Sequence, residues 1–154
     1  MPTAKLKRYL DDRHVRYVSI AHSPAYTSQE LAATMHVHGS ELAKTTIVKT
    51  DRGFVMAVLA GPNHVDLERL RRCVGAGSAS LASEKEFKDL FPECELGAMP
   101  PFGNLYGLPV YVDQDLERDP SIVFNAGTHT EAIRMDLEDF KRLVEPMLAS
   151  FSRH

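Results

Sequence analysis

A chain of 154 residues is long enough to enclose one hydrophobic core and too short for two domains of ordinary size, so we predict a single domain over residues 1–154. Hydrophobic residues make up 44% of the chain and charged residues 25%, a composition that excludes a disordered or fibrous protein. The formal net charge of −3 excludes a surface that attracts polyanions everywhere, and it confines any contact with nucleic acid to a local basic patch.

The sequence shows no export or membrane signal. No apolar run is long enough to cross a bilayer, and the first residues lack the apolar core of a secretion signal. The two cysteines, Cys73 and Cys94, stand in no paired motif, which fits a reducing compartment. We therefore expect a cytoplasmic protein with reduced thiols and no membrane contact.

The first forty residues are predicted to alternate between helix and strand. Apolar residues at helical spacing indicate a short helix over 3–14, and residues 16–22 alternate as a strand should. Pro24 ends that strand because it has no amide donor. A capping box at 27–30 then predicts a second helix over about 28–37.

The clearest strand of the chain follows. Residues 45–50 are largely β-branched, a turn at 51–53 comes next, and residues 54–60 supply a returning strand, so we predict a hairpin. Lys44 stands where the chain enters this sheet. Taken alone, such a lysine most often rests its stem on apolar neighbours and keeps its ammonium in water.

The middle of the chain is predicted to hold two helices around a short strand. Asp66 is placed to cap a helix that continues to Val74. Residues 79–82 indicate a short strand, and a capping box at 83–86 begins a helix that Pro92 stops.

The C-terminal third begins with a loop and continues with a second hairpin. Glycines and prolines interrupt all periodicity over 93–108, which predicts an ordered loop. Residues 109–113 and 121–126 are strand candidates, and a turn at 127–129 leads into a further strand over 130–135.

The last helix is expected to begin at Asp136 as its cap and to run past Pro146 to Met147. Its apolar residues recur with helical period: Leu137, Phe140, Leu143, Val144 and Met147. With no internal repeat or linker, these elements predict an α/β (α+β) fold: a single mixed, largely antiparallel sheet with surrounding helices.

Metal and nucleophile chemistry is not indicated. The residues that could bind zinc lack the spacing of a zinc site, so we predict no metal; they are His22, His36, His38, His64, His129 and Cys94. We also expect neither cysteine to act as a nucleophile, because Cys73 lies near a helix C-terminus and Cys94 has only acidic neighbours. No serine-hydrolase, phosphate-loop or dinucleotide motif is present. What remains is Lys44 and two glycine-bearing loops at 97–103 and 127–129.

Four motifs, taken together, resemble a known family. They are His22-Ser23-Pro24-Ala25-Tyr26-Thr27-Ser28, Ala43-Lys44-Thr45-Thr46-Ile47-Val48, Gly97-Ala98-Met99-Pro100-Pro101-Phe102-Gly103 and Asn125-Ala126-Gly127-Thr128-His129-Thr130. In this order they resemble the YbaK/EbsC family, the free-standing relatives of the editing domain inserted in bacterial prolyl-tRNA synthetases. The resemblance covers most of the chain and implies the fold of that editing domain.

The resemblance also implies a reaction: hydrolysis of the ester that links a wrong, small amino acid to the terminal ribose of a tRNA, with tRNA for proline as the expected carrier. Lys44 matches the essential lysine of the family, while Gly97 and Pro101 match its Gly-x-x-x-Pro loop. Lys44 would hold the terminal phosphate or the aminoacyl carbonyl, and the loop amides would stabilise the oxyanion. Water would attack without a covalent intermediate, and no cofactor is implied.

The substrate-binding residues implied by the resemblance are His22, Tyr26, Thr45, Met99, Phe102, Gly127, Thr128 and His129. Of these we expect Tyr26, Met99, Phe102 and His129 to form the walls of a pocket whose volume sets specificity. Two departures from the family pattern, Thr46 and Pro100, leave the amino acid open between alanine, cysteine, serine and threonine.

The expected partner is the acceptor end of a mischarged tRNA, with a synthetase or an elongation factor as a further partner. Basic residues that could contact the tRNA are Lys5, Lys7, Arg8, Arg13, Arg69, Arg71 and Arg72. Two alternatives stay open at this point: a non-catalytic nucleic-acid or protein-binding module of the same fold, and a hydrolase or binder of free aminoacyl compounds.

Overall fold

The computed structural model describes residues 2–22, 41–95 and 97–153. The predicted helix over 28–37 lies outside these residues. Within them the chain combines helices with largely antiparallel strands, so the predicted α+β class is confirmed. No helix in the described ranges is long and apolar enough to cross a membrane.

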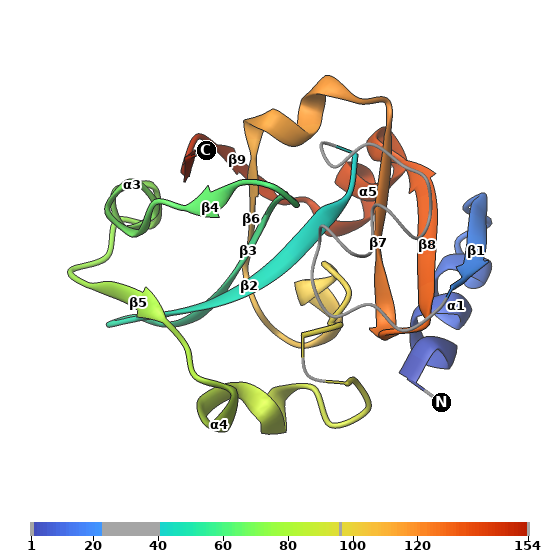
Figure 1. The fold of residues 1–154 in the computed structure, drawn as a ribbon, viewed down its shortest axis with the longest axis horizontal. Helices are drawn as coiled ribbons and strands as arrows, with labels where there is room; N and C mark the ends of the chain where they lie inside the picture. Colours follow the sequence, from blue (N-terminus) through green and yellow to red (C-terminus); the bar gives the residue numbers. More distant parts are fainter. Residues whose placement is uncertain (1, 23–40, 96, 154) are drawn as a thin grey trace.

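The strands of the described residues form three sheets (Figure 1). The five-stranded sheet has the order β5 (Ala79–Leu81), β2 (Ala43–Thr50), β3 (Gly53–Ala60), β6 (Val110–Asp113) and β9 (Met147–Ala149). The three-stranded antiparallel sheet has the order β1 (Tyr17–Ala21), β8 (Glu131–Asp136) and β7 (Ser121–Thr128). A small third sheet pairs β4 (His64–Val65) with β10 (Ser152–Arg153). The helices are α1 (Pro2–Asp12), α3 (Leu67–Val74), α4 (Glu84–Phe87) and α5 (Leu137–Val144), with 3-10 turns at Lys88–Leu90, Gly103–Leu105 and Gln114–Arg118.

The prediction of a single sheet is wrong in this respect. The two larger sheets meet at one isolated parallel bridge, between Leu42 and Val123. β2 pairs with β3 along its whole length and with β5 at its far end, so it can approach β7 only near its start. Strand twist then carries β2 away from β7, and the sheets separate (Figure 1).

The main hydrophobic core lies between the two larger sheets. Ala43 and Ile47 of β2 point into it, as does Phe124 of β7, and α1 and α5 contribute Leu10 and Phe140. A second cluster occupies the opposite face of the five-stranded sheet. Because successive residues of a strand point to opposite faces, each face of β2 belongs to a different cluster.

Most local predictions for the middle of the chain are confirmed. The hairpin forms as β2 and β3, and α3 begins at Asp66, whose Oδ1 accepts a hydrogen bond of 3.1 Å from the amide of Arg69. The predicted capping box joins Ser83 and Glu86 in both directions at the start of α4.

The end of the last helix differs from the prediction. α5 stops at Val144, and Glu145 adopts a left-handed conformation with φ 51°. Pro146 disfavours a helical residue before it and offers no amide to continue the ladder. Met147 therefore lies on β9, beside β6, and Asp136 precedes the helix without a capping hydrogen bond from its side chain.

A buried carboxylate fixes the C-terminal segment, which the sequence did not indicate. Asp113 is 1% exposed, and its Oδ1 accepts hydrogen bonds from the amides of Phe151 (2.8 Å) and Ser152 (3.0 Å). Its Oδ2 accepts a further bond of 2.7 Å from the hydroxyl of Ser152. These bonds hold Phe151, which has no exposed surface, in the second hydrophobic cluster.

Candidate functional site

Lys44 lies on the second residue of β2 and is half-buried. Its cross-strand neighbour is Leu59, a member of the second cluster, so its side chain leaves β2 on the face opposite Ala43. Burial lowers the pKa of its ammonium, because desolvation disfavours the charged form. Lys44 forms no hydrogen bond or ion pair with any residue in the described ranges. A half-buried cation without a partner is poised to bind a ligand oxygen.

Thr45 follows Lys44 and therefore points to the other face of β2. Its cross-strand partner is Val58, which belongs to the main core. The structure thus separates the side chain of Thr45 from that of Lys44, although the sequence grouped them. A direct contact with the same ligand group as Lys44 is not expected for Thr45.

The two predicted glycine-bearing loops lie against each other. Gly127 donates a hydrogen bond of 2.9 Å to the carbonyl of Ala98 and accepts one of 2.8 Å from the amide of Glu95. The Oε1 atom of Glu95 also accepts a bond of 2.7 Å from the amide of His129. Glu95 and Ala98 are therefore held against the last part of β7 and the turn that follows it.

Gly97 and His129 are direct neighbours across these loops. Gly97 has φ +84°, and a Cβ atom on it would lie 3.5 Å from Cε1 of the His129 imidazole. His129 is 8% exposed. The turn itself lies at residues 129–130 and starts two residues later than predicted, because a bulge between Asn125 and Thr128 lengthens β7.

His22 reaches the same turn from the end of β1. Its amide donates a hydrogen bond of 2.9 Å to the carbonyl of Thr130, and its side chain is half-buried. The hydroxyl of Thr128 lies 3.4 Å from the amide of Thr130, within the turn. Three of the predicted substrate-binding residues, His22, Thr128 and His129, are thus brought together, while Tyr26 lies outside the described residues.

The remaining loop residues are core residues. Phe102 has no exposed surface, and its ring centroid lies 5.5 Å from that of Phe124 and 5.4 Å from that of Phe140. Met99 is 4% exposed in the same core, and Pro101 is buried. Met99 and Phe102, predicted as pocket walls, therefore anchor the loop, because their side chains face the core between the sheets.

The free edge of β7 joins these parts of the molecule. In its first half the amide of Val123 donates a hydrogen bond of 3.2 Å to the carbonyl of Glu41, beside the Leu42–Val123 bridge. In its second half Gly127 binds residues 95–98 as described. Asn125 lies between the two junctions, two residues after Val123, just as Lys44 lies two residues after Leu42.

Two residues of this site were missed by sequence reasoning. Glu95 was noted only as an acidic neighbour of Cys94, since no local pattern shows that it reaches His129. Asn125 stood within a quoted motif but was not singled out, because its place between two junctions follows from the pairing of distant segments.

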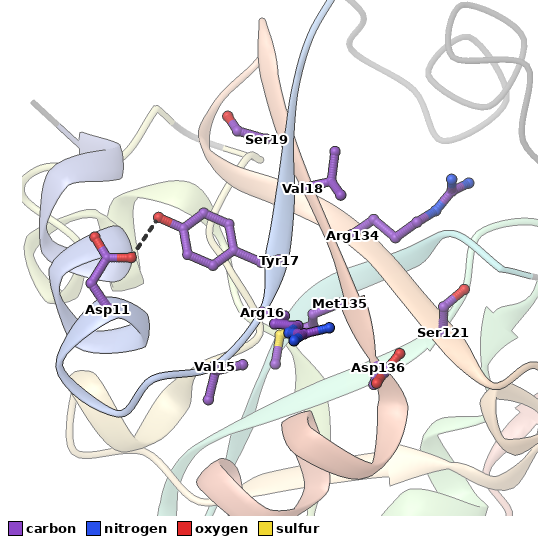
Figure 2. A pocket seen from close by; sticks show the side chains of 10 residues that line it. All are labelled: Asp11, Val15, Arg16, Tyr17, Val18, Ser19, Ser121, Arg134, Met135 and Asp136. Atoms are coloured by element: carbon purple, nitrogen blue, oxygen red, sulfur yellow. Dashed lines mark hydrogen bonds between the residues drawn. The ribbon is translucent and has the colours of Figure 1, made fainter.

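A wide groove of about 890 Å³ opens elsewhere, between α1 and the outer side of β1 and β8 (Figure 2). Tyr17 points toward α1, and its hydroxyl hydrogen-bonds to Asp11 at 3.0 Å (Figure 2). Arg134 lies at the other side of the groove and pairs with Glu41 at 2.9 Å. None of the predicted site residues lines this groove, and its charged groups are of both signs, so we do not place the chemistry there.

Cys94 lies close to the docked loop but is a poor nucleophile. Its sulfur is 3.5 Å from the hydroxyl of Tyr106. Burial raises the pKa of the Cys94 thiol, which disfavours the reactive thiolate. The arrangement therefore suits charge stabilisation and positioning of water better than covalent catalysis.

Comparisons with known proteins identify the family of this chain. The family described as the aminoacyl-tRNA editing domain matches residues 22–143. The multifunctional Ser/Thr-tRNA deacylase ProXp-y of Escherichia coli (strain K12) is 37% identical over 100 residues, which cover 64% of this chain and 59% of that protein. A proline–tRNA ligase of Bacillus cytotoxicus is 29% identical over 85 residues, 55% of this chain and 15% of the ligase. The chain thus spans 59% of the length of the E. coli relative.

Solved structures share the fold. A protein given the provisional description of trans-editing enzyme for prolyl tRNA synthetase superposes with a TM-score of 0.84 at 23% identity, covering 99% of this chain and 98% of the other. The hypothetical protein APE2540 superposes with a TM-score of 0.88 at 20% identity, covering 97% and 99%. At these identities the likeness establishes the fold alone.

Proposed function

The chain belongs to the family of aminoacyl-tRNA editing domains, and on this premise we propose that it is a hydrolase that removes a wrong amino acid from tRNA in trans. The observation that carries the proposal is the half-buried, unpartnered ammonium of Lys44, two residues after the bridge to β7, the strand on which the glycine loop docks. Ester hydrolysis develops negative charge on an oxygen, and fixed cations and amides stabilise such charge.

The docked loop limits which amides can serve as oxyanion donors. Pro100 and Pro101 have no N–H group, and the amide of Ala98 is used by the carbonyl of Glu95 at 3.0 Å. Gly97 and Met99 remain, since neither amide is hydrogen-bonded to another described residue. We therefore propose the Gly97 and Met99 amides as the donors, with Lys44 as the cation.

Water is the proposed nucleophile. The Cys94 thiol is disfavoured as a thiolate, and the candidate site otherwise offers Lys44, amides, His22 and His129. The rate of hydrolysis is then raised by holding water and substrate in attacking geometry. The ribose hydroxyl next to the ester is a further group that can orient this water.

The amino acid removed is proposed to be small. A synthetase rejects a smaller or isosteric amino acid weakly, since one methylene is worth only about 1–3 kcal/mol, and a second pocket then sorts the product by size. The E. coli relative is named for serine and threonine, and the Bacillus relative is a proline–tRNA ligase. We propose serine, threonine and alanine esters as the substrates to test first, on tRNA for proline and on the tRNAs that normally carry these amino acids.

Contact with tRNA is proposed for α1. The arginines of α3 are engaged within their own helix, for example Arg71 with Glu68 at 2.6 Å. Two cations on α1 and just after it lie beside aromatic rings: the ammonium of Lys5 is 4.4 Å from the Tyr106 centroid, and the guanidinium of Arg13 is 3.8 Å from the Tyr9 centroid. Cations beside aromatic rings suit a nucleic acid end with exposed bases and phosphates. A synthetase or elongation factor is proposed to deliver the mischarged tRNA.

A panel of mischarged tRNAs tests the proposal. The full chain is mixed with alanyl-, seryl-, threonyl- and cysteinyl-tRNAs, each on its own tRNA and on tRNA for proline, and release of the amino acid is followed. We expect release from a small subset of the panel. Binding without release would instead identify a non-catalytic module, and hydrolysis of free aminoacyl esters without regard to tRNA would identify a small-molecule hydrolase.

A further inference from the structure

Asn125 holds a buried hydrogen-bond acceptor that the fold does not use. Within the described part of the chain its Oδ1 atom is buried and has no hydrogen-bond partner. Leaving such a group unsatisfied costs about 1–3 kcal/mol, and nearly all buried polar groups in folded proteins have a partner. An acceptor kept at this cost is a candidate for a ligand.

Apolar side chains flank Asn125 on its face of the sheet. Its partner across the β7–β8 ladder is Ala132, which has no exposed surface. Ala132 clusters with Leu42 and Val123 on the same face of the sheet, and all three are apolar. A bound molecule that carries a donor group would satisfy Oδ1.

Asn125 and Lys44 follow the same bridge. Leu42 pairs with Val123 in parallel, and Lys44 and Asn125 each stand two residues further along, on the faces that carry Leu42 and Val123. The pair thus presents one cationic donor and one neutral acceptor, and neither is used by the described residues.

An aminoacyl ester carries the complementary pair of groups. Its carbonyl oxygen accepts hydrogen bonds, and its α-ammonium, attached to the next carbon, donates them. We infer that Asn125 is a substrate-positioning residue whose Oδ1 accepts a hydrogen bond from the α-ammonium of the aminoacyl group, while Lys44 holds the carbonyl oxygen. This inference rests on the proposed function. The ammonium is favoured over a ribose hydroxyl because charge-assisted hydrogen bonds are about twice as strong as neutral ones.

Blocking the amine tests the inference. Single-turnover deacylation is measured with seryl- and alanyl-tRNA and with the same tRNAs after N-acetylation, which removes the charge of the amine. The variants are Asn125→Ala and Asn125→Asp, and Asn104→Ala is the matched control. Asn104 is an exposed asparagine on the 3-10 turn Gly103–Leu105, where its amide binds Tyr9 at 3.0 Å.

We expect Asn125→Ala to slow release from the free-amine substrate about tenfold or more, the loss for one charge-assisted bond. Its rate on the N-acetylated substrate should stay within about twofold of wild type, because that substrate cannot make the bond. Asn125→Asp, which keeps an acceptor, should retain the preference for the free amine, and Asn104→Ala should behave as wild type.

Equal slowing of both substrates by Asn125→Ala would overturn the inference, and so would no slowing of either. A tRNA ending in 2′-deoxyadenosine lacks the ribose hydroxyl and tests whether Oδ1 binds that group instead. If Asn125→Ala slows release from the N-acetylated substrate but not from the 2′-deoxy substrate, Oδ1 binds the ribose and the inference is wrong. Wild-type protein that releases no amino acid from any tRNA would remove the proposed function itself, a result distinct from the other two.

Discussion

The backbone amide of His129 donates a 2.7 Å hydrogen bond to Oε1 of Glu95, which joins two loops that are 34 residues apart in the chain. With the bonds of Gly127 to Glu95 and to Ala98, it fixes the glycine loop on the end of β7. The proposed oxyanion donors Gly97 and Met99 lie within or next to this docked segment. Their placement therefore depends on Glu95.

Replacing Glu95 should impair catalysis through position. Glu95→Ala removes the acceptor of the His129 amide, and hydrogen bonds to charged groups contribute about 1.5–3 kcal/mol. We expect a fall in kcat of tenfold or more with a smaller change in KM, measured by steady-state deacylation. Glu95→Gln keeps an acceptor oxygen and should recover most of the rate; equal loss in both variants would contradict a positioning role.

A side chain at Gly97 should impair deacylation, and Gly107 provides the matched control. Both glycines have positive φ, +84° and +72°, so alanine strains the backbone at either by about 1–2 kcal/mol. A Cβ at position 97 meets His129 at 3.5 Å, whereas one at position 107 meets nothing within 4 Å. Thermal unfolding should show similar losses for the two variants, and deacylation should fall only for Gly97→Ala. Equal deacylation rates of the alanine variants at Gly97 and Gly107 would show that Gly97 is not part of the site.

Lys44→Met should stabilise the protein while it inactivates it. Burial lowers the pKa of Lys44 in the folded state, so below that pKa the unfolded state binds the proton more tightly and the charged lysine destabilises the fold. The penalty is present at neutral pH and disappears as pH rises from the lowered pKa toward the ordinary value for lysine. We expect a gain of about 0.5–1 kcal/mol in the free energy of unfolding at pH 7, shrinking at alkaline pH. Chemical denaturation at several pH values measures it, and a loss of stability at pH 7 would contradict the account.

Asp113→Ala should lower stability without a direct effect on the site. It leaves the amides of Phe151 and Ser152 without their acceptor in a buried position. The cost should be about 2–4 kcal/mol, from two unsatisfied donors that regain part of their hydration. Denaturant unfolding measures this loss, and deacylation well below the melting temperature should stay near wild type.

Binding of tRNA should depend on α1 more than on α3. Arg8 is exposed and lines a groove of about 520 Å³ with Lys5 and Arg13. Arg72 of α3 already has Glu68 at 3.4 Å. Arg8→Glu should weaken binding of deacylated tRNA several-fold, with a shallower dependence on salt, and Arg72→Glu should change it little. Filter binding at two salt concentrations distinguishes the two, and a larger effect of Arg72→Glu would move the contact to α3.

The elements that the sequence predicted well are those whose signals are local. The hairpin around Lys44 follows from β-branched residues and a turn, and the caps at Asp66 and Ser83 follow from three-residue spacings. Pro146 shows the limit of periodicity. The apolar spacing continues to Met147, but the helix ends at Val144 because Pro146 has no amide donor.

The site was predictable in part. The motifs picked out Lys44, Gly97 and His129, and the last two are neighbours in space. Local pattern could not show that Phe102 packs in the core, since an aromatic residue beside a glycine loop fits a pocket wall equally well. It also could not relate Asn125 to Lys44, because that relation depends on the Leu42–Val123 bridge between residues 81 positions apart.

Single-turnover deacylation by Lys44→Ala, with Lys49→Ala as its control, tests the central claim most directly. Lys49 lies on the same strand and pairs with Glu86 at 2.8 Å on the surface, so its loss changes charge equally without touching the site. We predict that Lys44→Ala remains folded by circular dichroism and loses at least about a hundredfold in rate, the range for removal of one group that stabilises an oxyanion, while Lys49→Ala keeps the wild-type rate. Deacylation by folded Lys44→Ala at the wild-type rate would contradict the assignment of Lys44 as the catalytic cation.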